Sequence, residues 1–349
     1  MGLCGISEGT KVRRLSIHSH RKLNDLNNCL QNMRLRSVLN FDEKHHPSKK
    51  LINSRLLSVC DTIYTRIDEF PVNLRYFACI NCMAFPVSLR NLQTLIFQSG
   101  TSEISEIWEM RQLRHVNFSR IVQPDPPSAK TEGKNSIIIL DNLQTLRNVQ
   151  NFRCTEEVLQ RIPNLKKLGI YFDSVAVLDG GYYCLNNLVH LLKLESLSCS
   201  IFSFTSFRKN IAFPISLKKL SLSGFCLPWE DMTIVGSLPN LQVLKIFDSL
   251  RGIEWEPNEG EFLQLKYLRL HDIYLKNWIA DSIHFPSLER LLIRNCGLEI
   301  PSAIGEIPTL VSIEVFRCGA SVVTSAKQIQ KEQHSLGNDY LQVRIVNPW

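Results

Sequence analysis

The sequence predicts an α/β solenoid, in which short repeats each add one strand to a parallel sheet. The pattern Leu-x-x-Leu-x-Leu recurs along the chain, from Val12/Leu15/Ile17 to Leu310/Ile313/Val315. The thirteen spacings between the fourteen copies average about 23 residues, inside the period of leucine-rich repeats. An apolar content of 44% and a charged content of 21% are typical of a folded globular protein. We therefore expect a leucine-rich repeat solenoid of about 14 repeats, shaped as a curved horseshoe.

Each repeat is expected to begin with a strand whose first, fourth and sixth positions face the core. One copy buries too little to fold alone, but stacked copies form a continuous core behind a parallel sheet on the concave wall. The ninth position prefers Asn or Cys, whose side chain bonds backbone groups where the chain leaves the strand. Cys82, Cys296 and Cys318 occupy that position.

Three copies are weaker than the others, because a polar residue takes the third apolar slot. They begin at Leu35, Leu57 and Leu143, and the polar residues are Asn40, Thr62 and Asn148. Between the strands, short turn and helix signals such as residues 154–159 predict irregular loops and short helical or 3₁₀ segments on the convex side. Four tryptophans that precede later strands are expected to pack in this convex layer: Trp108, Trp229, Trp255 and Trp278.

The chain is expected to hold an N-terminal lead-in over residues 1–11 and a leucine-rich repeat domain over residues 12–349. Repeat spacing is irregular in the first half, where long loops are predicted near 121–136 and 173–190. From about residue 194 the spacing settles to 22–24 residues. A regular second half therefore follows an irregular first half.

The net charge of +7 is confined to one end of the chain. Residues 1–55 hold eleven Lys and Arg residues against four Asp and Glu residues, an excess of seven. The other 294 residues hold 29 of each sign and are neutral overall. An electrostatic contact with an acidic partner is therefore expected at the N-terminal end.

Several classes of protein are excluded by the sequence. No apolar run approaches the ~18 residues of a transmembrane helix, and the N-terminus lacks a secretory signal, so a cytoplasmic location is expected. Eleven cysteines without a regular spacing favour buried thiols, and the repeat register accounts for both Cys79 and Cys82 of the single C-x-x-C. No phosphate-binding loop, zinc-protease motif or nucleophile elbow is present. We expect no enzyme activity, no catalytic residues, no metal and no cofactor in this chain.

The outward positions of the later strands predict a protein-binding surface. Stacking aligns these positions into columns that mix cations with exposed aromatic residues, which are the types that dominate interface hot spots. The residues expected to bind a partner on the concave surface are Lys245, Phe247, Tyr267, Arg269, His271, Arg294, Phe316 and Arg317. The alternative is a solvated sheet surface whose charges serve solubility only. A nucleic-acid partner is not expected, because residues 56–349 are neutral and the basic N-terminus lacks interleaved aromatic residues.

Several stretches resemble plant intracellular immune receptors of the nucleotide-binding leucine-rich repeat type. Residues 12–18 (VRRLSIH) resemble the junction where their repeats begin, and residues 89–95 and 107–116 resemble the repeats themselves. Residues 154–170, residues 255–262 (WEPNEGEF) and the tail 339–346 are similar to the late blight resistance group of nightshade plants. The resemblance covers nearly the whole chain. It implies a part of a disease resistance protein that senses a pathogen effector or a guarded host protein.

The resemblance also implies a partner domain that the sequence lacks. Members of the family carry a coiled coil and a nucleotide-binding switch before the repeats, whereas this chain begins about ten residues before its first repeat and has no P-loop. ATP or ADP binding would belong to that switch domain. In the family the first repeats restrain the switch, and release leads to a defence response and hypersensitive cell death. The residues expected to contact the switch are Arg13, Arg14, Arg21, Lys22, Arg34 and Arg36.

Other functions are compatible with the same repeats. A stand-alone truncated regulator or decoy, or a leucine-rich repeat substrate receptor of a ubiquitin ligase, would have a similar sequence, although no F-box helix precedes Val12. In each case the expected partners are proteins, and contact with a membrane is expected only through those partners.

Overall fold

The computed structural model describes residues 13–17, 35–40, 56–65, 71–82, 89–98, 105–122, 137–173, 184–201, 211–225, 227–248 and 250–346. The chain divides into two compact units. Unit 1 comprises Met1–Phe152 and Gln160–Leu165, and unit 2 comprises Arg153–Leu159 and Lys166–Trp349. The predicted lead-in lies outside the described residues, as do residues 123–136 and 174–183 of the two predicted loops.

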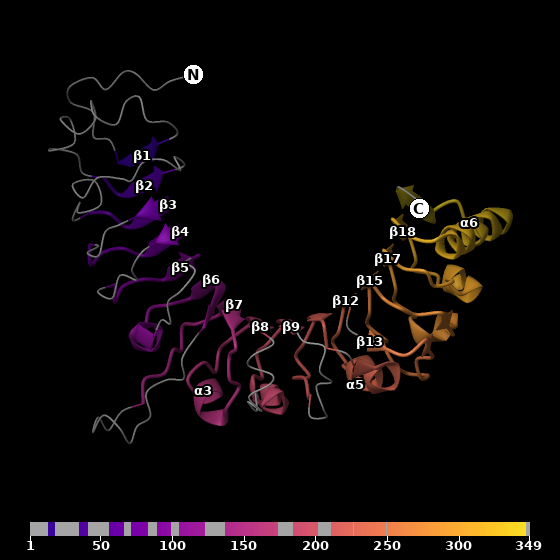
Figure 1. Ribbon diagram of the computed structural model, residues 1–349, viewed down its shortest axis with the longest axis horizontal. Coiled ribbons are helices and arrows are strands. Elements are labelled where there is room, and N and C mark those ends of the chain that lie inside the picture. The colour runs from indigo at the N-terminus through magenta and orange to yellow at the C-terminus, as the bar shows by residue number, and fades with distance from the viewer. Residues whose placement is uncertain are drawn as a thin grey trace. The chain divides into compact units, whose positions relative to one another are not determined.

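Unit 1 is a stack of parallel strands in sequence order (Figure 1). Its strands are β1 (Arg14–Ile17), β2 (Ser37–Asn40), β3 (Val59–Thr65), β4 (Tyr76–Cys82), β5 (Thr94–Phe97), β6 (His115–Val122) and β7 (Thr145–Gln150). A 3₁₀ helix, η3 (Ser105–Glu109), lies between β5 and β6, and the division between the units falls within helix α3 (Glu156–Gln160). Each strand pairs with the next in parallel, so every repeat adds one strand.

Unit 2 repeats this arrangement with short helical segments between its strands (Figure 1). Its main strands are β8 (Lys167–Phe172), β9 (Ser196–Ile201), β10 (Lys219–Ser223), β12 (Val243–Phe247), β15 (Tyr267–His271), β17 (Arg290–Arg294), β18 (Ser312–Phe316) and β19 (Gln342–Val346). Two small sheets pair β11 (Leu227–Pro228) with β13 (Leu250–Arg251) and β14 (Glu254–Trp255) with β16 (Asn277–Trp278). The helical segments are η4 (Leu185–His190), η5 (Trp229–Met232), α5 (Thr233–Gly236), η6 (Ser282–His284), η7 (Ser302–Glu306) and α6 (Ala320–Ser335).

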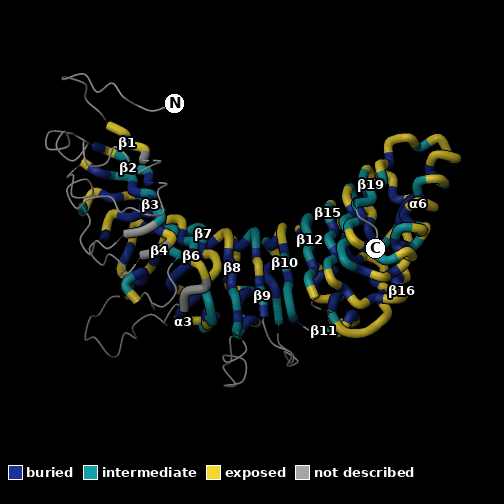
Figure 2. Tube along the Cα trace, turned by 45° about the horizontal axis from the view of Figure 1, so that its top comes forward, coloured by how far each residue is buried: buried dark blue, intermediate teal, exposed yellow. Residues whose placement is uncertain are grey.

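The repeat motif places its apolar residues in the core as predicted. In β12, for example, Leu244 and Ile246 are fully buried while the residues between them are partly exposed, and β15 and β18 follow the same alternation. Figure 2 shows buried residues in dark blue and intermediate ones in teal along the strands. In the described residues each of the fourteen predicted copies holds a strand. The predicted leucine-rich repeat solenoid is therefore confirmed.

A tight turn before each strand fixes where the strand begins. In unit 1 the N–H of Leu92 donates to the carbonyl of Leu89 at 3.2 Å, and the side-chain amide of Asn91 donates to the carbonyl of Val72 at 2.9 Å. In unit 2 the amide of Asn240 makes the equivalent bond to the carbonyl of Ile215 at 2.9 Å. These bonds pair carbonyls that the turn would otherwise leave unsatisfied, and they link each repeat to the one before it.

The eighth repeat position forms a column with left-handed backbone, which we call the strand-end column. In the repeats of β10, β12, β15, β17 and β18 it consists of Gly224, Asp248, Asp272, Asn295 and Arg317, with φ between 43° and 72°. Each N–H donates at 3.0–3.1 Å to the carbonyl of the seventh position in the following repeat. Gly, Asn and Asp tolerate this conformation, whereas Arg317 does not favour it.

Asn40 and Thr62 fill core slots of unit 1 as predicted, and they do so as a pair. Both side chains are buried, with 2% and 1% of their surface exposed, and the amide of Asn40 donates to the hydroxyl of Thr62 at 3.5 Å. Burying a polar group is costly unless it finds a partner. The register that stacks these two residues supplies that partner.

The prediction that Asn148 takes the third apolar slot of its repeat is wrong. Asn148 is exposed and adopts a left-handed φ of 56°, and its amide donates to the side chain of Asn117 at 2.8 Å. The register between β6 and β7 shifts at this point, so Val149 turns inward and is fully buried beside Leu146. Asparagine tolerates the left-handed conformation, and across the shift β6 advances from Asn117 to Ile121 while β7 advances only from Arg147 to Val149.

The tryptophans are buried behind the strands, as predicted. In unit 2, Trp255 stacks between Trp229 and Trp278, with ring centroids 4.7 Å and 5.5 Å apart. Phe262 and Phe285 pack against the edges of this stack. Three successive repeats thus share one aromatic layer, which fixes the separation of their strands. Trp108 is buried in unit 1.

The C-terminal part of unit 2 departs from the predicted short segments. Helix α6 has 16 residues and buries Val322, Ala326 and Ile329, and it leads into a further strand, β19. The register aligns Tyr340 with Leu310, so an exposed tyrosine stands where the other repeats have a buried leucine. The motif therefore does not mark this strand.

Candidate protein-binding surfaces

The predicted recognition residues lie on the partly exposed face of the unit 2 strands, which we call the strand face. They occupy three columns set by the parallel register of β12, β15, β17 and β18. Tyr267 is in the first column, Lys245 and Arg269 are in the second, and Phe247, His271, Arg294 and Phe316 are in the third. Arg317 follows β18 in the strand-end column. The structure thus brings these eight residues together, and their role in binding stays a prediction.

Cations and aromatic rings contact one another on the strand face. The guanidinium of Arg269 lies over the ring of Phe247, 5.0 Å from its centroid, and the ammonium of Lys245 lies 5.8 Å from the centroid of Tyr267. The Phe247 ring also meets the His271 ring edge-on, with centroids 5.4 Å apart. Such contacts fix the orientation of long side chains before a partner arrives.

His271 lies at the centre of this cluster. Burial lowers the pKa of His271, the neighbouring Arg269 and Arg294 lower it further, and Asp272 opposes them. The Nε2 atom of His271 lies 3.3 Å from a carboxylate oxygen of Asp272. Because its pKa is below the ordinary value of 6.5, His271 is neutral at neutral pH.

Several polar atoms of the strand face are covered yet lack partners. Among the described residues, the Nε atoms of Arg269 and Arg294 and the Nδ1 atom of His271 are buried without a hydrogen bond. Native structures leave few buried polar groups unpaired, so each such group needs an explanation. Three of them fall in one cluster of the strand face, which makes this cluster a candidate for a binding site.

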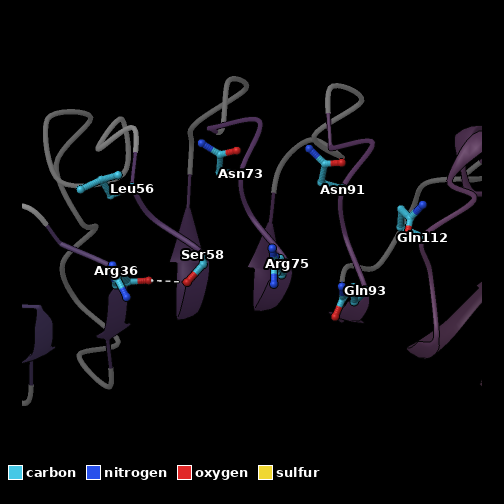
Figure 3. A pocket seen from close by; sticks show the side chains of 8 residues that line it. All are labelled: Arg36, Leu56, Ser58, Asn73, Arg75, Asn91, Gln93 and Gln112. Carbon is cyan, nitrogen blue, oxygen red and sulfur yellow. Dashed lines mark hydrogen bonds between the residues drawn. The ribbon is translucent and has the colours of Figure 1, made fainter.

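Unit 1 carries a second basic surface, at the start of its strands. We call the second repeat position, directly after the first core residue, the strand-start column. In unit 1 it holds Arg13, Arg36, Ser58, Arg75, Gln93, Arg114 and Gln144, without an acidic residue. Arg36, Ser58, Arg75 and Gln93 line a polar hollow of about 540 Å³ with Leu56, Asn73, Asn91 and Gln112 (Figure 3).

Half of the residues predicted to contact a switch domain lie in the described chain. Arg13 and Arg36 are in the strand-start column, and Arg14 begins β1; all three are exposed. Arg21, Lys22 and Arg34 lie outside the described residues. The hollow adds Arg75 and the column adds Arg114, which the charge count missed because residues 56–349 are neutral overall. Comparing the residues at the second position of each of the first repeats would have identified both Arg75 and Arg114.

The strand-start column of unit 2 differs, because its cations pair with carboxylates of the neighbouring repeat. The ammonium of Lys266 lies 2.8 Å from Glu289, and that of Lys218 lies 3.5 Å from Glu195. Exposed pairs of this kind contribute little to stability, but they cancel charge locally. On the strand face, by contrast, Lys245, Arg269 and Arg294 have no ion pair among the described residues.

The cysteines follow the predicted buried-thiol pattern. Cys60, Cys79 and Cys199 are buried in the core. At the ninth position, the thiols of Cys296 and Cys318 donate to the carbonyls of Arg294 and Phe316 at 3.0 Å and 3.3 Å. Burial raises the pKa of Cys296 to about 12. The side chain of Cys82 lies outside the described residues.

The described part of the chain lacks two further kinds of feature. No group of three or more His, Cys, Asp or Glu side chains is arranged to bind a metal ion. No helix in the described part of the chain is both long enough and apolar enough to cross a membrane.

Comparison with curated proteins connects the chain to plant disease resistance. A late blight resistance protein homolog of Solanum demissum is 34% identical over 328 residues, which cover 86% of this chain and 24% of that protein. Another from the same species is 36% identical over 309 residues, which cover 81% of this chain and 24% of that protein. The chain thus spans about a quarter of the length of these relatives. No family model matches the sequence.

Solved structures with a similar fold include bacterial leucine-rich repeat proteins. An internalin (inlF) from Listeria monocytogenes is 14% identical, with a TM-score of 0.46 over 92% of this chain and 93% of that one. A leucine-rich repeat protein of Leptospira interrogans is 16% identical, with a TM-score of 0.43 over 88% and 89%. Both TM-scores are below 0.5, so the repeat and the strand register carry the assignment of the fold.

Proposed function

Because the chain belongs to the group of late blight resistance protein homologs, we propose that it is the protein-binding repeat domain of a plant immune receptor. The strand face of unit 2 binds a pathogen effector or a guarded host protein. The strand-start column of unit 1 contacts a nucleotide-binding switch domain and restrains it. Release of that restraint leads to the defence response and hypersensitive cell death.

One observation supports the recognition role: cations without an ion pair, Arg269 and Lys245, lie over aromatic rings on the partly exposed side of the sheet. Phe247 orients Arg269 at 5.0 Å, and both side chains are only partly buried. Aromatic and arginine side chains supply most of the binding energy at protein interfaces when a partner removes them from water. A surface that served solubility alone would have no need of the aromatic rings.

The restraining role follows from the charge of unit 1. Arg13, Arg14 and Arg36 are exposed and would complement an acidic surface on the switch domain, which favours association and sets its orientation. Holding a switch at 1:99 and then reversing the ratio needs roughly 5.5 kcal/mol of differential binding. Several contacts must therefore act together. ATP or ADP would bind to the switch domain and not to this chain.

The recognition role is tested by a crosslinking pull-down from elicited leaf tissue. We expect a crosslinked protein that is lost when Phe247 and Tyr267 become Ala and Arg269 and Arg294 become Gln. A matched control changes two exposed aliphatic residues, Leu192 and Ile215, to Ala and two paired cations, Lys218 and Lys266, to Gln. If the strand-face variant still captures the same protein, recognition does not depend on the strand face.

The restraining role is tested with a recombinant switch domain from the family. Changing Arg13, Arg14 and Arg36 to Glu should abolish its association with the chain. Changing Lys166, Lys218 and Lys266 to Glu alters the net charge equally, but in unit 2, and should have little effect. Association that both variants weaken equally would show only general charge attraction.

A further inference from the structure

Arg269 and Arg294 lie close together on the strand face, and neither forms an ion pair among the described residues. They belong to adjacent strands, two residues apart along the sheet, which places their Cα atoms roughly 8 Å apart. Both guanidinium groups influence the pKa of His271, which lies between them in the register. In the described chain no carboxylate lies within 4.0 Å of either arginine.

The environment makes these two charges poorly solvated. Each Nε atom is covered and unpaired, while the side chains as a whole are only partly buried, so the outer N–H groups face the solvent. A guanidinium that has lost part of its hydration without gaining a partner binds an anion more strongly than a fully solvated one does. The neutral state of His271 adds no further positive charge.

Arg269 is also held in place by an aromatic ring. Phe247 packs under the guanidinium of Arg269 at 5.0 Å and against the ring of His271 at 5.4 Å. In the third column Arg294 lies between His271 and Phe316. Groups fixed before binding lose less conformational entropy when a ligand arrives. Two arginines on adjacent strands, one of them held by an aromatic ring, can bind one planar carboxylate together.

We propose that Arg269 and Arg294 form a seat for one aspartate or glutamate side chain of the partner protein. Apolar residues of the same partner segment pack on Phe247 and Phe316, which flank the two arginines. The seat rests on the proposed function, because it names the chemistry by which the strand face recognises its protein partner.

The surroundings favour a single carboxylate over a nucleic-acid backbone. Glu314 continues the column of Arg269 beyond Leu292, and Asp248 and Asp272 follow the third column at the strand ends. A chain of phosphates crossing the strands would meet these carboxylates and be repelled. A peptide with one acidic residue between apolar residues meets the arginines and the aromatic rings without that repulsion.

The seat is tested with a phage-displayed library of random 12-residue peptides, selected on the full chain. We expect the selected peptides to be enriched in Asp or Glu next to apolar residues. Changing Arg269 and Arg294 to Gln should weaken the best peptide about tenfold or more. Replacing the peptide's acidic residue by its amide should weaken binding to the parent chain and have no further effect on the variant, as in a double-mutant cycle.

A matched control variant changes Lys218 and Lys266, which are already paired with carboxylates, to Gln. It removes the same charge from unit 2 and should leave the peptide's affinity within about twofold. Unchanged thermal unfolding of both variants shows that the fold is intact. Equal weakening by both variants would overturn the seat.

The remaining outcomes separate the seat from the proposed function. Peptides without acidic residues that still depend on Phe247 would overturn the seat and leave the binding role of the strand face standing. A selection that yields no peptide, or only peptides insensitive to every strand-face change, would overturn both. A 12-nucleotide single-stranded DNA that competes as well as the acidic peptide would replace the seat by a nucleic-acid site.

Discussion

The two units of this protein place their unpaired cations at different points of the same repeat. In unit 1 the second repeat position is repeatedly arginine, at Arg13, Arg36, Arg75 and Arg114, and carries no acidic residue. In unit 2 the same position alternates in sign, so that Lys266 pairs with Glu289 and Lys218 with Glu195. On the strand face of unit 2, Lys245 and Arg269 instead lie over aromatic rings, without an ion pair among the described residues.

This difference shows that one repeat geometry supports two kinds of surface. A row of exposed arginines without aromatic residues suits an acidic surface that is held by charge and released easily. Arginines fixed against aromatic rings suit a partner that removes them from water, where each contact contributes more. The sheet fixes the spacing of both sets, and the residue types at the outward positions decide which surface results.

The largest effect is expected from Trp255, which connects three repeats of unit 2 through its stacked neighbours. Changing Trp255 to Ala should lower the free energy of unfolding by about 3–5 kcal/mol, because it leaves a cavity in the aromatic layer. Repeats contact mainly their neighbours, so amide hydrogen exchange should rise in β12, β15 and β17 more than in β2–β5. A uniform rise through both units would show that they unfold as one.

The second largest effect is a loss of stability at acidic pH, which should depend on His271 in unit 2. The pKa of His271 is lowered in the folded state, mainly by burial, from its ordinary value of 6.5. The unfolded chain therefore binds the proton more readily, and stability is lost as pH falls from about 6.5 through the lower folded-state pKa. The His271→Gln variant should lose part of this dependence in urea titrations between pH 7 and pH 5. A variant with the parent's pH profile would contradict the assignment.

A smaller gain is expected from relieving strain at Arg317. This residue has a φ of 49°, in a column otherwise made of Gly, Asp and Asn. Changing Arg317 to Asn should raise the free energy of unfolding by roughly 0.5–1 kcal/mol, because Asn tolerates the left-handed region better than Arg. Thermal unfolding measures the gain. The control Asp248→Asn should leave the free energy of unfolding nearly unchanged, because aspartate already tolerates the left-handed region at that position.

The smallest effects are expected from single cations of the strand-start column, and they should differ between the units. Lys266→Gln removes an exposed ion pair and should lower stability by at most about 0.5 kcal/mol. Arg75→Gln removes an unpaired cation from a row of like charges and should be neutral or slightly stabilising. Urea midpoints of the two variants, at low and at high salt, measure both stability changes. High salt should reduce the difference between the two variants, because it screens exposed charges.

Most of the repeat architecture follows from the sequence, because the leucine pattern fixes both the period and the face of each strand. The exceptions are places where a single residue changes the strand register or replaces the expected leucine. Asn148 reads as a core position until its left-handed backbone turns Val149 inward. Tyr340 replaces the leucine that would have marked β19.

The candidate surfaces were predictable in part. Repeat register identified Phe247, Arg269 and Arg294 as neighbours, but not the stacking or the covered Nε atoms, which depend on side-chain conformation. The net charge of residues 1–55 identified Arg13 and Arg36. It missed Arg75, because acidic residues cancel the charge of Arg75 in the total for residues 56–349. Charge acts over about 10 Å, so the column in space matters more than the total along the sequence.

The division of labour between the two units is tested most directly by hydrogen exchange of the chain bound to a family switch domain. We predict that protection appears in unit 1, around β1–β5 and the turns that line the hollow beside Arg36 and Arg75. The strand face of β12, β15, β17 and β18 should keep the exchange rates of the free chain. Protection of that strand face, with unit 1 unchanged, would contradict the assignment of the two surfaces.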